Sequence, residues 1–240
     1  MYLNNISRPV KVFFSLLPSI FYLLPYQLTP AGFYNNPSNM GTLEIEVKFF
    51  LPDMDTVRDR LQQAGVESHG RFFEHNTCFE NAARDLHRNE SLLRLRKDNK
   101  TTLTYKTKPA IHDADFKVFE ELEVAVSDHA TMLNILQALG FHRTQVYEKY
   151  RETFSMGATE LCMDSMPFGN FLEIEGEKDS IRRLAQQMGM QWPRRILYNY
   201  RAMFDVIKQQ LDLPFNDITF DNFHGVDMDL DDLMPRFEAG

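Results

Sequence analysis

The stretch Glu44–Lys48, with the sequence EIEVK, alternates charged and apolar residues without interruption. In an extended chain, side chains two positions apart lie on the same face. The stretch therefore predicts a β-strand with Glu44, Glu46 and Lys48 on one face. A single half-buried strand with a mixed polar face in water would also explain this pattern. The pattern gains weight because other predicted strands repeat it.

Two later strands carry the same arrangement of alternate glutamates. Glu121 and Glu123 form one pair, and Glu173 and Glu175 form the other. An amphipathic helix is predicted after each of the three strands, with a capping aspartate near its start and a glycine at its end. The predicted caps and stops are Asp53 or Asp55 with Gly65, Asp128 with Gly140, and Asp179 with Gly189.

Basic residues occupy alternate positions in three other predicted strands. The pairs are Arg94 and Arg96, Lys106 and Lys108, and Lys149 and Arg151. A further strand reaches Asp164 and pairs through a short turn with the strand that carries Glu173 and Glu175. From residue 43 to residue 176 the pattern gives about eight strands, joined in ways that suit antiparallel neighbours.

Composition limits the classes of function. The chain has 240 residues, 43% of them hydrophobic, and a formal net charge of −8. The negative charge argues against general binding to nucleic acid or to an anionic membrane, although a local basic cavity remains compatible with it. The two cysteines, Cys78 and Cys162, are expected to be reduced, which predicts a cytoplasmic protein. The sequence contains no glycine-rich phosphate loop and no histidines at metal-ligand spacing.

The two ends of the chain differ from its centre. Residues 1–42 are predicted to be an extension outside the domain, and residues 10–28 are apolar but broken by two prolines. Three interpretations stay open: translation that starts at Met40, a secretory signal, or a membrane anchor. Residues 43–213 form the predicted domain. Residues 214–240 are acidic and are predicted to be a mobile tail.

The charged faces have two possible explanations. On an open sheet they would form a solvated lattice of ion pairs, each contributing about 0–1 kcal/mol. In a closed barrel of about eight strands they would surround one small ligand, and the barrel would have no sheet edge. Buried like charges need partners. A polyanion on the basic wall and Mg²⁺ or Mn²⁺ on the acidic wall would provide them.

The Glu44-x-Glu46-x-Lys48 strand resembles the ExExK signature of the CYTH domains, the triphosphate tunnel metalloenzymes. This family includes class IV adenylate cyclases, thiamine triphosphatases and inorganic triphosphatases. The resemblance extends over residues 43–205, and the other charged pairs named above occur in the expected order. It implies an α+β fold: a closed eight-stranded antiparallel β-barrel, or tunnel, with helices packed outside.

The resemblance also implies a role for each charged residue. Glu44, Glu46 and Lys48 would be catalytic. The triphosphate would be bound by Lys48, Arg94, Arg96, Lys106, Lys149 and Arg151, with Lys108 nearer the rim. Mg²⁺ or Mn²⁺ would be bound by Glu44, Glu46, Glu121, Glu123, Asp164, Glu173 and Glu175, some of them through a second layer of contacts. No single general base is assigned.

The resemblance predicts a metal-dependent phosphohydrolase that acts on inorganic triphosphate or on an organic or nucleoside triphosphate. Two alternatives stay open: a cyclase that converts ATP to cyclic AMP and diphosphate, and a non-catalytic module that binds polyphosphate or nucleotide. Cyclases of this family often carry His-Phe just before the first strand, where this chain has Gly41-Thr42. That difference favours the hydrolase. The physiological triphosphate and the oligomeric state stay open.

Overall fold

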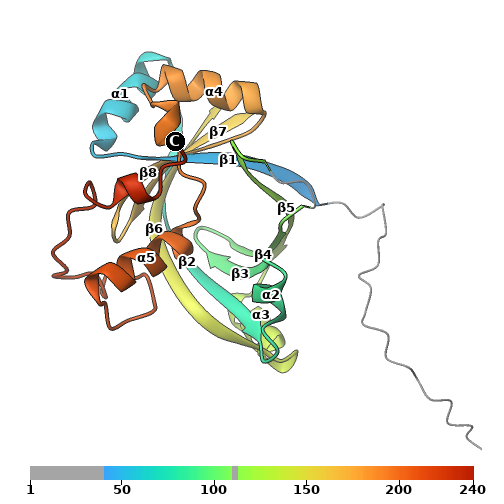
Figure 1. Ribbon diagram of the computed structural model, residues 1–240. Coiled ribbons are helices and arrows are strands. Elements are labelled where there is room, and N and C mark those ends of the chain that lie inside the picture. The colour runs from blue at the N-terminus through green and yellow to red at the C-terminus, as the bar shows by residue number, and fades with distance from the viewer. Residues whose placement is uncertain (1–40, 110–112) are drawn as a thin grey trace, which may run out of the picture. The chain divides into compact units, whose positions relative to one another are not determined.

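The computed structural model describes residues 41–109 and 113–240. Eight antiparallel strands close into a barrel in the order β1-β5-β4-β3-β2-β6-β7-β8, and β8 pairs with β1. The predicted closed barrel is confirmed, and Figure 1 shows it with its helices outside. The strands are β1 (Thr42–Phe50), β2 (Ser68–Asn81), β3 (Leu92–Lys97), β4 (Thr101–Thr107), β5 (Lys117–Val126), β6 (Phe141–Met156), β7 (Thr159–Met166) and β8 (Gly169–Glu175).

Two of the three predicted helix caps are confirmed. Asp53 accepts a hydrogen bond at the start of α1 and Asp128 does so at the start of α3. The third prediction was wrong: the side chain of Glu177, rather than that of Asp179, accepts from the first backbone N–H groups of α4. Glu177 sits one position before the helix, where its longer side chain reaches those donors. The helices are α1 (Met54–Gln63), α2 (Asp85–Arg88), α3 (His129–Ala138), α4 (Lys178–Gln187) and α5 (Tyr200–Leu211), with 3₁₀ turns η1 (Trp192–Arg194) and η2 (Met234–Arg236).

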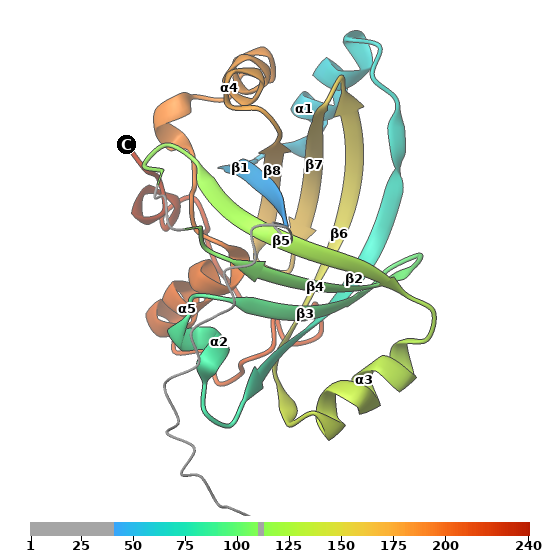
Figure 2. The same cartoon turned by 90° about the vertical axis from the view of Figure 1, so that its right-hand side faces the viewer.

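The apolar residues of several strands point outward and are covered by helices. Val47 of β1 and Ile174 of β8 pack in one buried cluster with Leu61 of α1 and Ile181 of α4. Figure 2 shows α1 and α4 together at one end of the barrel. Because alternate residues face opposite sides of a strand, the charged residues between these apolar positions must face the barrel interior.

The C-terminal segment, residues 214–240, differs from the mobile tail that the sequence predicted. Ile218, Phe223, Met234 and Phe237 are buried in one cluster with α5. Figure 1 shows this segment wrapped beside α5. The acidic composition suggested a solvated tail, but the apolar residues spaced between the acidic ones provide a packed face.

This segment also completes the barrel sheet. Strand β7 pairs with β6 only from Tyr150 onward, so the preceding part of β6 has a free edge. Ile218 fills it: its N–H donates to the carbonyl of Val146 at 2.8 Å, and its carbonyl accepts from the N–H of Glu148 at 2.9 Å. Exposed edges are liable to pair with other chains, so this cover removes such a site.

The interpretations of residues 1–40, including the possible anchor at 10–28, lie outside the described residues. Among the helices of the described part, none combines the length and the apolar character needed to cross a membrane. Cys78 and Cys162 are both buried and carry free thiols. The cytoplasmic location stays a prediction.

Candidate functional site

The barrel interior is a charged cavity of about 1050 Å³. Every residue that the sequence assigned to the site lines it, with the exception of Asp164, which is 0% exposed and is covered by its partners. The alternation of charged and apolar residues along each strand explains this result. Alternate residues share a face, and closure of the barrel turns the charged faces toward one another. The predicted residues that line the cavity are Glu44, Glu46, Lys48, Arg94, Arg96, Lys106, Lys108, Glu121, Glu123, Lys149, Arg151, Glu173 and Glu175.

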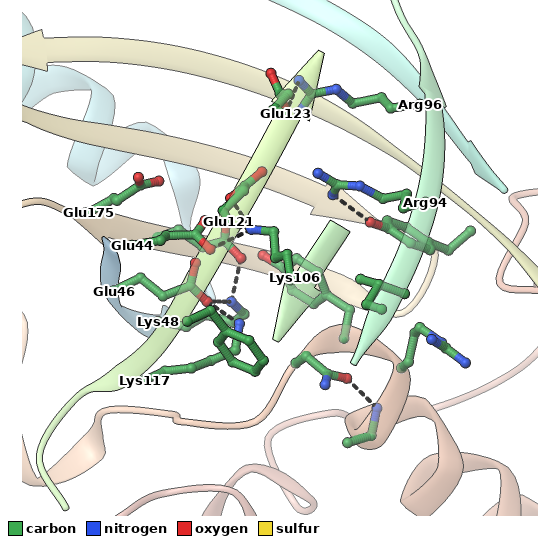
Figure 3. Close-up of a pocket in the computed structure, with 18 of the residues that line it drawn as sticks. Glu44, Glu46, Lys48, Arg94, Arg96, Lys106, Lys117, Glu121, Glu123 and Glu175 are labelled. Atoms are coloured by element: carbon green, nitrogen blue, oxygen red, sulfur yellow. Dashed lines mark hydrogen bonds and ion pairs between the residues drawn. The ribbon is translucent and has the colours of Figure 1, made fainter. Parts of the chain in front are cut away.

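Three carboxylates form an acidic cluster on neighbouring strands. Glu44 and Glu46 belong to β1, and Glu175 of β8 is directly opposite Glu46 in the strand pairing. Each offers an oxygen within 4.8 Å of the others. Figure 3 shows these three side chains on one side of the cavity and Arg94 and Arg96 on the other. Oxygen donors gathered in this way match the ligand preference of Mg²⁺ and Mn²⁺.

The cluster carries an electrostatic cost. Burial, together with the negative charges of Glu44 and Glu46, raises the pKa of Glu175 to about 8. Burial and the Glu46 carboxylate also raise the pKa of Glu44. A raised carboxyl pKa means that the charged form is disfavoured in this place. A bound cation would relieve the repulsion.

Lys117 of β5 is a site residue that the sequence analysis missed. Its ammonium group donates to Glu46, and it lines the cavity. Burial alone would raise the pKa of Glu46, but the charge of Lys117 holds it at about 2. The signal was present: Lys117 lies four residues before Glu121 on the same strand, so the two share a face.

Lys106 of β4 joins two glutamates from different strands. Its Nζ lies 2.6 Å from Oε1 of Glu44 and 2.8 Å from a carboxylate oxygen of Glu121. Glu121 is opposite Lys106 in the pairing of β4 with β5. Lys106 therefore stands at the boundary between the acidic cluster and the basic wall.

Asp164 and Glu173 bind cations of the protein itself. Asp164 is 0% exposed and accepts from Nζ of Lys149 at 2.9 Å and from Nε of Arg151 at 2.6 Å. Glu173 accepts from both Lys48 and Arg151. Each of these two carboxylates therefore binds two cationic side chains of the protein.

Glu74 of β2 is a second residue that the sequence analysis missed. It is buried and faces Lys149 at 3.6 Å and Arg96 and Arg151 at 4.0 Å. Burial would raise its pKa, but Lys149 and Arg151 hold the pKa at about 2. Its strand was predicted, yet the next inward positions are Asn76 and Cys78, so no charge alternation marked the face.

Arg94 of β3 has the most unusual environment among the basic residues. It is 9% exposed, and its guanidinium donates to the hydroxyl of Tyr147 at 2.9 Å and to Thr104 Oγ1 at 3.3 Å. Its Nε is buried without a hydrogen-bond partner, and within the described residues no carboxylate lies at ion-pair distance. Buried cations need a counter-charge. The hydrogen-bond partners of Arg94 among the described residues are therefore neutral hydroxyl groups.

Helix α5 covers the cavity at the end where β3 begins. Tyr200 and Arg201 from its first turn line the cavity, and Nε of Arg201 donates to Gln145 of β6 at 2.6 Å. The sequence analysis did not assign these two side chains to the site. Nothing in a helical period shows which residue of the first turn enters a cavity.

Comparison with known proteins gives a consistent result. A family model described as "CYTH domain" matches residues 42–188. A protein of known structure from Pyrococcus horikoshii OT3, PH1012, is 25% identical, with a TM-score of 0.56 over 65% of this chain and 96% of its own. A search of curated proteins found no significant match.

Two more distant structures share the fold. A candidate adenylate cyclase from Vibrio parahaemolyticus is 19% identical, with a TM-score of 0.58 over 69% of this chain and 99% of its own. A candidate adenylyl cyclase from Hippeastrum, described as having a dominant triphosphatase activity, is 19% identical, with a TM-score of 0.52 over 68% of this chain and 95% of its own.

Proposed function

We propose that this chain, which belongs to the CYTH domain family, is a Mg²⁺- or Mn²⁺-dependent phosphohydrolase acting on a triphosphate. Members of the family are typically metal-dependent triphosphatases. The observation that carries the proposal is Arg94, a buried cation with no carboxylate at ion-pair distance in the described part of the chain. It faces a cluster of repelling carboxylates across one cavity. A polyanion together with a divalent cation would neutralise both.

The basic residues would bind the phosphate oxygens. Arg94 offers an unpartnered Nε, and the planar guanidinium suits two parallel hydrogen bonds to a phosphate. Arg96 lies 3.5–4.0 Å from three carboxylates and would share its guanidinium group between them and a phosphate. The proposed phosphate-binding set is Lys48, Arg94, Arg96, Lys106, Lys149 and Arg151.

The carboxylates would have two separate roles. Glu44, Glu46 and Glu175 fit a divalent cation, because each presents an oxygen and together they repel one another. When bound, such a cation neutralises phosphate charge and lowers the pKa of a coordinated water. Asp164 and Glu173 would instead hold Lys48, Lys149 and Arg151 in place. Glu121 and Glu123 also line the cavity, where they would pair with Lys106 and Arg96.

Water and a ribose hydroxyl are both conceivable nucleophiles in such a cavity. The protein contributes mainly positioning and charge stabilisation in phosphoryl transfer, so the same residues serve either reaction. The dominant triphosphatase activity named for the Hippeastrum protein supports hydrolysis. Cyclisation of ATP stays the alternative, and product analysis separates the two.

The test is a substrate panel with the full-length chain. Inorganic triphosphate, ATP and thiamine triphosphate are each incubated with Mg²⁺ or Mn²⁺, and released phosphate and cyclic AMP are both measured. We expect phosphate release that needs the metal. If cyclic AMP is the main product, the chain is a cyclase and the hydrolase proposal is wrong.

A paired substitution tests the acidic cluster. Glu44→Gln with Glu46→Gln should abolish turnover and leave triphosphate binding in place, because the basic wall is unchanged. The matched control is Glu67→Gln with Asp59→Asn, which removes two exposed carboxylates outside the cavity. Wild-type turnover in the cluster variant would contradict its role as the metal site.

A further inference from the structure

Tyr200, the first residue of α5, touches three charged groups of the cavity at once. Its hydroxyl donates to Oδ2 of Asp164 at 2.8 Å. Nζ of Lys48 lies 4.3 Å from the centre of its ring, and Nζ of Lys149 lies 5.5 Å from it. The side chain itself is 7% exposed. One side chain from outside the barrel sheet therefore contacts two lysines and Asp164, the buried counter-ion of Lys149.

The ring is held in one orientation. Phe171 of β8 meets it edge to face at 5.3 Å between ring centres, and Phe168 does so at 6.3 Å. Asn199 caps the helix that carries it, accepting from the N–H of Ala202 at 2.8 Å. With its edge packed and its hydroxyl bonded, the ring presents a fixed face to the two ammonium groups.

Those ammonium groups are removed from water. Lys48 is 1% exposed and Lys149 is 3% exposed. The attraction between a cation and an aromatic face is strongest where the cation is desolvated. Both ammonium groups also donate to carboxylates, Lys48 to Glu173 and Lys149 to Asp164.

We propose that Tyr200 is a positioning residue that fixes Lys48 and Lys149 for contact with the phosphate oxygens of the substrate. The inference rests on the proposed triphosphate-binding function. The ring face sets the positions of the two ammonium groups, and the hydroxyl steadies Asp164, which in turn holds Lys149. Tyr200 acts on the substrate through these residues and does not itself take part in the reaction.

The alternative is a tyrosine that serves only the packing of α5. Packing alone predicts that a substitution lowers stability and leaves the affinity of the folded protein for triphosphate unchanged. Positioning predicts that the affinity for triphosphate falls when the hydroxyl alone is removed and falls further when the ring is removed as well. Measurements on folded protein at 25 °C distinguish these two outcomes.

The experiment compares Tyr200→Phe, which keeps the ring, with Tyr200→Leu, which removes it. Tyr200→Met is made alongside, so that failure of one variant to fold does not end the test. Tyr198→Leu is the control, because Tyr198 is exposed, packs on Phe237 and does not line the cavity. The dissociation constant of inorganic triphosphate is measured by calorimetry without metal, and KM and kcat are measured with Mg²⁺.

We expect Tyr200→Leu and Tyr200→Met to weaken triphosphate binding about tenfold or more, from the strength of a desolvated cation–π contact. Tyr200→Phe should weaken it only about threefold, because one hydrogen bond to Asp164 is lost. KM should rise in the same order while kcat changes less than KM. The Tyr198→Leu control should bind as the wild type does.

Two results would overturn the inference. In the first, folded Tyr200→Leu or Tyr200→Met binds triphosphate within about twofold of the wild type. In the second, Tyr200→Phe loses as much affinity as the variants without a ring. Wild-type protein that fails to bind triphosphate would instead overturn the proposed function, which separates the two failures.

Discussion

Asp164→Asn is the substitution whose effect the structure specifies most fully. Asp164 is 0% exposed and neutralises Lys149 and Arg151, while Tyr200 donates to the same carboxylate. Removing one partner of a buried ion pair costs about 3–5 kcal/mol, because the remaining charge stays buried. For a domain of roughly 200 residues this corresponds to a fall in Tm of about 6–20 °C. The same substitution at exposed Asp59 should leave Tm unchanged.

Inorganic triphosphate should reverse part of this loss. In the Asp164→Asn variant, Lys149 and Arg151 lose one of their buried counter-charges, and phosphate oxygens can supply it. A ligand at about a hundred times its dissociation constant stabilises the folded state by about 2.7 kcal/mol. We therefore expect the rise in Tm on adding triphosphate to be larger in the variant than in the wild type, as measured by calorimetric scans without metal.

The alternative role for Asp164 is to bind the metal directly, instead of serving as a counter-ion for Lys149 and Arg151. In that case Asp164→Asn would keep the wild-type Tm in metal-free buffer and would lose the stabilisation that Mg²⁺ or Mn²⁺ provides. A metal-free variant as stable as the wild type would show that Asp164 is not the counter-ion that stabilises buried Lys149 and Arg151. The two readings thus differ in a measurement that needs no enzymatic activity.

Three further predictions concern single residues. Glu74 has a folded-state pKa of about 2, below its ordinary value of 4.5, so its contribution is complete above about pH 4.5 and is lost as pH falls toward 2. That contribution is about 3 kcal/mol, and Tm should fall less steeply with acid in Glu74→Gln. Arg94→Lys should weaken triphosphate binding at least tenfold with little change in Tm, since no carboxylate loses a partner; an equal affinity would contradict the anion site. Phe237→Ala should lower the free energy of unfolding, measured by urea denaturation, by about 3–5 kcal/mol, whereas the exposed control Asp232→Ala should not. Equal stabilities of the two variants would support the mobile tail that the sequence predicted.

The barrel and its charged interior were predictable because they depend on a local rule. Alternation fixes the face on which Glu44, Glu46 and Lys48 lie, and closure makes that face the interior. The same rule would have found Lys117. It could not find Tyr200, whose entry into the cavity depends on how α5 packs against the barrel. The packed C-terminal segment was also missed, because its burial depends on the free edge of β6.

The roles of individual carboxylates depend on strand register, which a single sequence does not contain. Glu173 and Glu175 are two residues apart on the same face of β8. Glu173 is paired across the strands with Lys48, and although burial acts to raise its pKa, Lys48 and Arg151 hold that pKa well below its ordinary value. Glu175 is paired with Glu46 on one side and Glu160 on the other, and burial with the surrounding carboxylates raises its pKa to about 8. One motif thus supplies a counter-ion for the basic wall and a candidate metal ligand, and the neighbouring strands decide which residue takes which role.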